Sequence, residues 1–171
     1  MLVCIGLYLL VLLNSPDVKP LSTIEQSEFT PEEIQESQLI IPKIAVNVRI
    51  YDGDLSVLNK GIWHRFPERG DPVEGGNFIL SGHRFTMGRT PGETRQKSYL
   101  YNIDKLKEGD EILVDWQKIR YSYKITKVYQ VKPDQTEIEE PSKEAKLTLY
   151  TCTLAGSADG RVVVEAESVD D

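Results

Sequence analysis

The chain has 171 residues, of which 40% are hydrophobic, and a formal net charge of -7. This length suits one folded domain with a short N-terminal extension. The acidic balance argues against nucleic acid as the main partner, because phosphate binding requires clustered lysine and arginine side chains. The two cysteines, Cys4 and Cys152, lie in different sequence contexts and do not form a disulfide framework. Cysteine and histidine are not clustered at the spacing of zinc ligands, so we predict neither a metal site nor a cofactor.

Residues 1–13 are almost wholly apolar. Thirteen helical residues span about 20 Å, which is short of the ~30 Å hydrocarbon core of a bilayer. The run has no basic region before it and no small-residue cleavage site after it, as a secretory signal would have. We expect it to be the C-terminal part of a membrane anchor that begins outside this chain. The alternative is a packed helix of a soluble domain.

Residues 14–37 combine Ser-Pro, Lys-Pro and Thr-Pro steps with several acidic side chains, which is typical of a solvated spacer. Within it, Thr30-Pro31-Glu32-Glu33 matches the N-terminal cap of a short helix. A flexible stalk without fixed structure is the alternative.

The folded domain is predicted for residues 38–171 and consists mainly of short strands. Short helical turns are expected at 55–60 and 99–106, and polar loops at 85–98 and 132–146. About seven or eight strands with frequent turns and little helix are typical of an all-β closed barrel or sandwich. Alternating or continuous apolar residues predict strands at 39–44, 46–51, 77–83, 111–116, 119–131, 147–153 and 161–164.

Cys152 and Arg161 flank a seven-residue turn predicted for 154–160, so we expect them at neighbouring strand ends. A cation beside a thiol favours the nucleophilic thiolate. The same cation can bind an oxyanion that develops during acyl transfer. His83, which ends an apolar strand after a glycine, would supply the acid–base partner. The alternative is that Cys152 is an inert, buried residue of an apolar strand.

From Leu39 to Glu167 the chain resembles the sortases, the cysteine transpeptidases of the bacterial cell surface. The order of the motifs, with Gly-His upstream of Thr-Leu-x-Thr-Cys and Arg downstream, is more specific than any one of them. The residues that carry the resemblance are Ile41-Pro42-Lys43-Ile44, Gly61-Ile62-Trp63-His64, Gly76-Asn77-Phe78-Ile79-Leu80-Ser81-Gly82-His83-Arg84, Gly109-Asp110, Thr148-Leu149-Tyr150-Thr151-Cys152 and Arg161.

The resemblance implies an eight-stranded closed β-barrel with short helices and a defined chemistry. Cys152 would attack a backbone carbonyl in a C-terminal sorting signal, typically of the Leu-Pro-x-Thr-Gly kind, and form a thioacyl-enzyme. An amine of a cell-wall precursor or a pilin lysine would then resolve it into a new amide bond. His83 would act as general acid and then as base, Arg161 would bind the substrate carbonyl and the oxyanion, and Thr151 would help to orient the substrate.

The resemblance also implies an enzyme that its N-terminal anchor holds on the extracytoplasmic face of the plasma membrane, where its partners are surface proteins bearing sorting signals. The chain shows no long lid segment, so it is closer to the compact classes D, E and F of the family than to the lidded class. Two other functions stay open. One is a non-catalytic surface β-barrel that serves as a binding module, and the other is a different cell-wall cysteine hydrolase.

Two further features have ordinary explanations beside functional ones. His64 is the competing histidine, and we expect a structural position, packed with Trp63 or exposed. The acidic segment 132–146 would lie between the strands that frame substrate specificity in the family. Oxygen clusters of this kind suit Ca²⁺, but we expect an acidic surface loop. Its acidic residues are Asp134, Glu137, Glu139, Glu140 and Glu144.

Overall fold

The structure is a computed structural model that describes residues 36–169. The predicted membrane anchor at 1–13, and all of the predicted spacer except its last two residues, lie outside the described residues. Within 36–169, no helix is long and apolar enough to cross a membrane.

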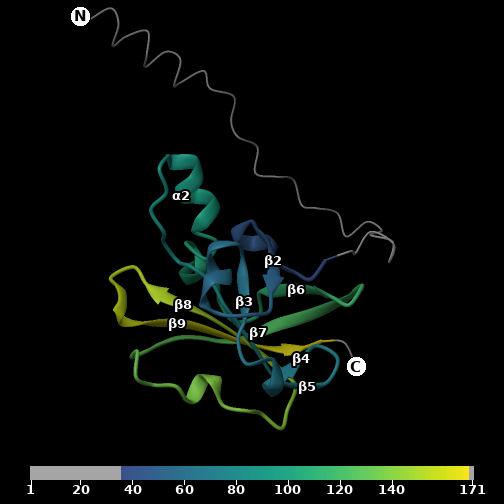
Figure 1. Cartoon of the computed structure of the whole chain (residues 1–171). Coiled ribbons are helices and arrows are strands. Elements are labelled where there is room, and N and C mark those ends of the chain that lie inside the picture. Colours follow the sequence, from purple (N-terminus) through teal and green to yellow (C-terminus); the bar gives the residue numbers. More distant parts are fainter. Residues whose placement is uncertain (1–35, 170–171) are drawn as a thin grey trace, which may run out of the picture.

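The described chain is built mainly from strands joined by short helical turns (Figure 1). One α-helix, α2, spans Pro91–Lys97. Turns of 3-10 helix are found at η2 (Pro42–Ile44), η3 (Leu55–Asn59), η4 (Pro67–Arg69), η5 (Ile103–Lys105) and η6 (Glu137–Glu139). The strands are β1 (Gln38–Ile41), β2 (Val46–Tyr51), β3 (Ile62–His64), β4 (Gly70–Asp71), β5 (Gly75–Ser81), β6 (Glu111–Trp116), β7 (Ile119–Val131), β8 (Lys146–Thr153) and β9 (Gly156–Ser168).

The strands form one closed barrel. Their order is β3-β2-β1-β6-β7-β9-β8-β5-β4, and an additional pairing of β3 with β5 closes a ring of eight strands. The short β4 lies outside the ring as a hairpin partner of β5. The predicted all-β, eight-stranded closed barrel is therefore confirmed. Most neighbours are antiparallel, but the pairs β2–β3 and β5–β8 are parallel. The C-terminal ends of β5 and β8 therefore meet at the same end of the barrel.

The barrel interior is filled by apolar side chains from each of the eight ring strands. On β8, Leu147 and Leu149 point inward, whereas Tyr150 belongs to a smaller cluster on the outer face. This alternation is the period-2 pattern that predicted the strand. The outer cluster also contains Ile138 of η6, so the segment that joins β7 to β8 packs against the outside of the barrel.

Several predicted boundaries differ from the structure. The strand predicted for 77–83 is β5 at Gly75–Ser81, so His83 lies beyond the end of the strand, and the strand predicted for 161–164 extends over Gly156–Ser168. The strand predicted for 39–44 ends at Ile41, because Pro42 has no N–H to continue the ladder and instead begins a 3-10 turn. The predicted loop at 85–98 contains α2, which is a correction. Thr90 caps this helix by accepting a hydrogen bond from the N–H of Glu93 (3.1 Å), and Pro91 takes its first position.

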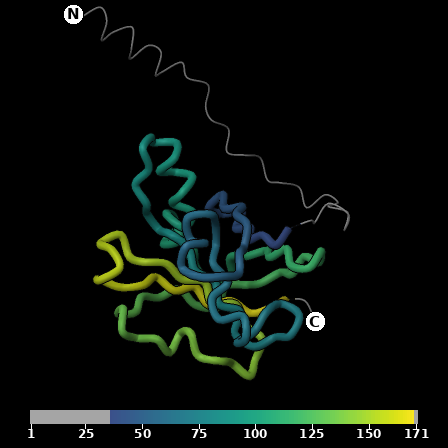
Figure 2. The backbone as a smooth tube through the Cα atoms, viewed as in Figure 1, coloured from purple at the N-terminus to yellow at the C-terminus, as the bar shows by residue number. Residues whose placement is uncertain are grey.

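The turn between β8 and β9 is also shorter than predicted. Thr153 pairs with Gly156, which leaves only two residues between the strands, and an irregularity in β9 accommodates the rest of 154–160. The irregularity ends at Gly160. A Cβ at this position would lie 2.8 Å from the carbonyl oxygen of Val131, so only glycine fits here without a shift. The hairpin extends from the barrel between α2 and the β7–β8 segment (Figures 1 and 2).

Candidate active site

Cys152 and Arg161 are direct neighbours across the β8–β9 ladder. Their Cα atoms are register partners in an antiparallel pair, so their side chains lie on the same face of the sheet. Cys152 is a free thiol and is partly exposed. The structure therefore brings together a thiol and a guanidinium that are adjacent in the barrel, as the sequence predicted from the turn between them.

His83 follows β5 on the other side of Cys152. The last β5–β8 register pair is Ser81 with Tyr150, and His83 and Cys152 each lie two residues beyond it in the chain. The strands still touch at Gly82, whose N–H donates to the carbonyl of Tyr150 (3.4 Å). Cys152 and Arg161 lie on β8 and β9, and His83 lies just past the end of β5, the other neighbour of β8, so the three residues come from adjacent segments at one end of the barrel. We call them the Cys152 row.

The backbone around His83 is fixed by close packing. A Cβ on Gly82 would lie 2.7 Å from the Ile62 side chain and 3.0 Å from that of Leu100, so glycine lets the segment pack against both. The carbonyl of His83 accepts a hydrogen bond from the N–H of Leu100 (3.1 Å). The side chain is half-buried, and this burial lowers the pKa of His83 because it disfavours the imidazolium.

Arg161 is held by its own strand. Its Nη1 donates to the carbonyls of Ser157 (2.7 Å) and Gly160 (3.0 Å). Both bonds use one nitrogen, so among the described residues the rest of the guanidinium fork stays available as a donor. A cation that is oriented in this way beside a thiol can stabilise negative charge on a neighbouring oxygen.

Thr151 lies on the opposite face of β8 from Cys152. Its side chain is 1% exposed, and its hydroxyl donates to the carbonyl of Gly82 at 2.7 Å. This bond ties the strand that carries Cys152 to the segment that carries His83. The substrate-orienting role that the resemblance implies for Thr151 stays a prediction.

His64 is in the core, away from the Cys152 row. It is 2% exposed, with Nδ1 2.8 Å from the Asp52 carboxylate and Nε2 3.2 Å from the Gly70 carbonyl. It packs edge-to-face on Phe78 and Trp116, with ring centroids 4.9 and 5.3 Å away, and not on Trp63. The expected structural position is what the structure shows, but the packing partners are different.

Polar residues on the outer face next to the Cys152 row were not singled out from the sequence. Tyr150 is buried and contacts Arg65 and Glu139. Burial, followed by the neighbouring Glu139, raises the pKa of Tyr150. Strand alternation sets Tyr150 on the face of Cys152, but its partners come from distant segments and gave no local signal.

The acidic residues of the β7–β8 segment do not gather at one point. Glu139 is buried, whereas Asp134, Glu137, Glu140 and Glu144 are exposed. Within the part of the chain that the structure describes, no group of three or more acidic, histidine or cysteine side chains is arranged to hold a metal ion.

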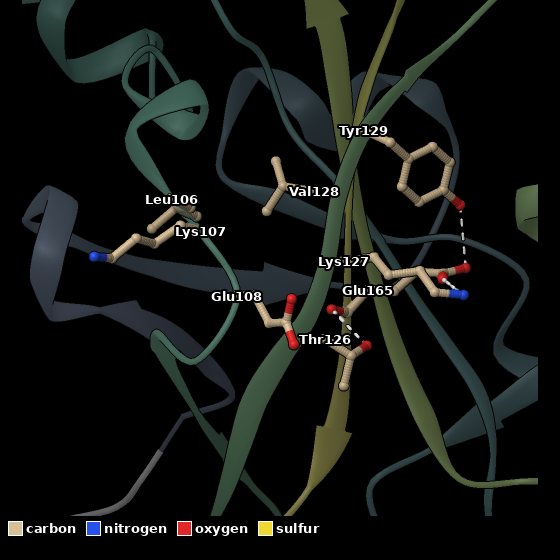
Figure 3. A pocket seen from close by; sticks show the side chains of 8 residues that line it. All are labelled: Leu106, Lys107, Glu108, Thr126, Lys127, Val128, Tyr129 and Glu165. Carbon is tan, nitrogen blue, oxygen red and sulfur yellow. Dashed lines mark hydrogen bonds and ion pairs between the residues drawn. The ribbon is translucent and has the colours of Figure 1, made fainter.

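A cavity of about 840 Å³ lies against β7 and β9 (Figure 3), and no residue of the Cys152 row lines it. Glu165, one of the two carboxylates that line it, accepts a hydrogen bond from the hydroxyl of Tyr129 (3.1 Å) and lies 3.9 Å from Lys127 Nζ. Burial and Glu165 raise the pKa of Tyr129 to about 12. Neither a thiol nor a histidine lines this cavity. We therefore assign the nucleophilic chemistry to the Cys152 row and not to this cavity.

Comparison with known proteins gives one consistent family. A family model described as Sortase domain matches residues 39–169. Sortase D of Bacillus subtilis is 30% identical over 150 residues, which cover 84% of this chain and 69% of that protein. Sortase SrtE1 of Streptomyces coelicolor is 30% identical over 149 residues, covering 78% of this chain and 40% of that protein.

Solved structures agree. A Clostridium perfringens Sortase D5 transpeptidase superposes with a TM-score of 0.65 at 31% identity, covering 78% of each chain. Sortase C-1 from Actinomyces oris superposes with a TM-score of 0.67 at 28% identity, covering 79% of this chain and 74% of that one.

Proposed function

Because this chain belongs to the sortase family of cysteine transpeptidases, which act at the bacterial cell surface, we propose that it cleaves a C-terminal sorting signal and joins the released acyl group to an amine. The observation that carries the proposal is the Cys152 row. A free thiol has an arginine as its cross-strand partner, and a histidine lies two residues past the end of the neighbouring parallel strand.

In the first half-reaction, Cys152 Sγ attacks the carbonyl carbon of the scissile amide. The carbonyl oxygen becomes an oxyanion that the guanidinium of Arg161 stabilises. The C–N bond then breaks, the leaving amine takes a proton from the His83 imidazolium, and a thioacyl-enzyme remains. Because its pKa is lowered, the His83 imidazolium is a stronger acid than an exposed one, although less of it is present at neutral pH.

In the second half-reaction, neutral His83 accepts a proton from the incoming amine as its nitrogen attacks the thioester carbonyl. A second oxyanion forms next to Arg161. When it collapses, the new amide leaves and the sulfur departs as a thiolate, which restores the starting enzyme. His83 therefore serves both directions of proton transfer, and Arg161 stabilises both oxyanions.

The substrates that we propose are surface proteins with a sorting signal of the Leu-Pro-x-Thr-Gly kind, and the acceptor is an amine of a cell-wall precursor or a pilin lysine. The apolar run at 1–13 supports attachment to the plasma membrane with the barrel on the extracytoplasmic face. The acyl donor and the amine would then meet the enzyme at the same surface.

The test is amide-bond formation by the full chain. The enzyme is incubated with a panel of sorting-signal peptides and two amines, triglycine and a lysine-containing peptide, and products are identified by mass spectrometry. We expect one peptide class to be cleaved and its N-terminal part to appear joined to an amine. Cleavage with water as the only acceptor would identify a hydrolase, and an untouched panel would contradict the proposal.

A further inference from the structure

We propose that Glu139 is a positioning residue for the substrate, because its buried carboxylate fixes the segment between β7 and β8 beside Cys152. The inference rests on the function proposed above. It deepens that function by assigning the residue that holds in place a segment which we propose contacts the substrate. Glu139 acts through the segment that carries it and does not touch the reacting atoms.

The β7–β8 segment begins at the Cys152 row. Val131, the last residue of β7, is the register partner of Arg161. The chain leaves the sheet there, and residues 132–137 are largely exposed. It returns at η6 to cover Tyr150, which lies on the same face of β8 as Cys152 and about 7 Å away along the strand. The exposed part of the segment therefore borders the Cys152 row between two anchored ends.

Glu139 is the anchor at the second end. Its side chain accepts a hydrogen bond from the Tyr150 hydroxyl (2.5 Å) and pairs with Arg65 Nη1 (3.1 Å), and the same Nη1 donates to the Tyr150 oxygen (2.8 Å). Each of the three groups thus touches the other two. Glu139 is only 7% exposed.

Burying a carboxylate makes the position of the segment specific. A charge that is removed from water is costly unless it is paired and hydrogen-bonded. If the segment slid along the barrel, Glu139 would lose Arg65 and Tyr150 together. Arg65 itself contacts the rings of Trp63 and Phe66, with its guanidinium carbon 5.2 and 4.7 Å from their centroids.

The backbone around Glu139 is held by separate contacts. Asn77, which is fully buried, donates through Nδ2 to the carbonyls of Ile138 (3.2 Å) and Glu140 (2.8 Å). Arg69 donates to the carbonyl of Glu139. When the β7–β8 segment is already ordered, substrate binding does not have to order it. Loss of this order should therefore raise KM more than it lowers kcat.

The experiment compares Glu139→Gln with Glu137→Gln in the full chain. Glutamine keeps the shape of the side chain but removes the charge that pairs with Arg65. Glu137 is a matched control, because it lies on the same turn and is exposed. With a peptide that the wild type processes, we expect Glu139→Gln to raise KM about tenfold with kcat within about threefold, and Glu137→Gln to change neither.

Alkylation of Cys152 by iodoacetamide is measured in parallel and should proceed at the wild-type rate in both variants. An unchanged KM in Glu139→Gln would overturn the inference. So would a loss of kcat together with slower alkylation, because the cluster would then act on the nucleophile. Should Glu139→Gln fail to fold, Tyr150→Phe, which removes one hydroxyl from the cluster, is held to the same outcomes.

A wild type that processes no peptide would contradict the proposed function and not the anchoring itself. Amide hydrogen exchange at 137–140 then decides. Faster exchange in Glu139→Gln than in Glu137→Gln would support the anchor, and equal exchange would overturn it.

Discussion

Arg161 has one nitrogen of its guanidinium engaged by the carbonyls of Ser157 and Gly160, and this fixes the direction in which the remaining donors point. The strand register alone sets Arg161 beside Cys152, since the two residues are opposite each other in the β8–β9 ladder. At the scale of the residue, the site therefore depends on main-chain geometry more than on contacts among the reactive side chains.

Arg161→Ala should lower kcat by about 10²–10³-fold, as the loss of one oxyanion donor does in other acyl transferases, with a smaller change in KM. Arg161→Lys should recover only part of the activity, because an ammonium lacks the planar fork. Steady-state kinetics on a processed peptide measures both. An effect of Arg161→Ala that is confined to KM would remove the transition-state role.

His83 should titrate below its ordinary pKa of about 6.5, since burial disfavours the imidazolium. The unfolded chain then binds this proton at a higher pH than the folded one. The stability that neutral His83 contributes is therefore lost as pH falls from about 6.5 through the folded-state pKa. NMR titration of the imidazole signals, with His83→Gln for assignment, tests this. A value at or above 6.5 would contradict the burial argument.

At the scale of the element, β2, β6 and β7 have the bounds that the sequence predicted. Apolar residues alternate along most of β2 and β7, and β6 carries a short apolar run, and both patterns are typical of strands with a buried face. The helix α2 was missed because it buries none of its residues, so no apolar period marks it. Its signal is the cap Thr90-Pro91-x-Glu93. The same signal at Thr30-Pro31-Glu32-Glu33 predicted a helix start, whereas the segment around Thr90 was predicted to be a loop.

Thr90→Ala should loosen α2 without weakening the barrel. The cap is worth about 1 kcal/mol to the helix, but nothing on α2 is buried that could transmit this loss to the core. We expect faster amide exchange at 91–97 and an unchanged Tm. A clear fall in Tm would show that α2 supports the barrel.

At the scale of the whole molecule, the barrel was predictable from the sequence. The polar cluster of Arg65, Glu139 and Tyr150 on its outer face was not. The strand pattern left a barrel and a sandwich open, and the resemblance to the sortases implied the closed barrel. The placement of Cys152 beside Arg161 followed from the turn predicted between them. Arg65, Glu139 and Tyr150 meet only once the ring has closed and η6 has folded back on it. Glu139 is one acid among several in its segment, and no local pattern distinguishes the buried one.

Phe78→Ala should cost about 3–5 kcal/mol in the free energy of unfolding, because it empties a large buried site. Phe78 is 1% exposed and packs on His64 and Trp116 at the centre of the core. Phe85, which is 52% exposed, provides the same substitution outside the core and should cost less than about 1 kcal/mol. Urea denaturation measures both, and equal costs would contradict the assigned core.

The most direct test of the central claim is the intact mass of the full chain after brief incubation with the sorting-signal panel. We predict a mass increase equal to the N-terminal part of one peptide on the wild type. The adduct should be absent from Cys152→Ala and lost on adding hydroxylamine, as a thioester requires. An adduct that persists in Cys152→Ala, or no adduct while the peptide is cleaved, would contradict Cys152 as the nucleophile of this enzyme.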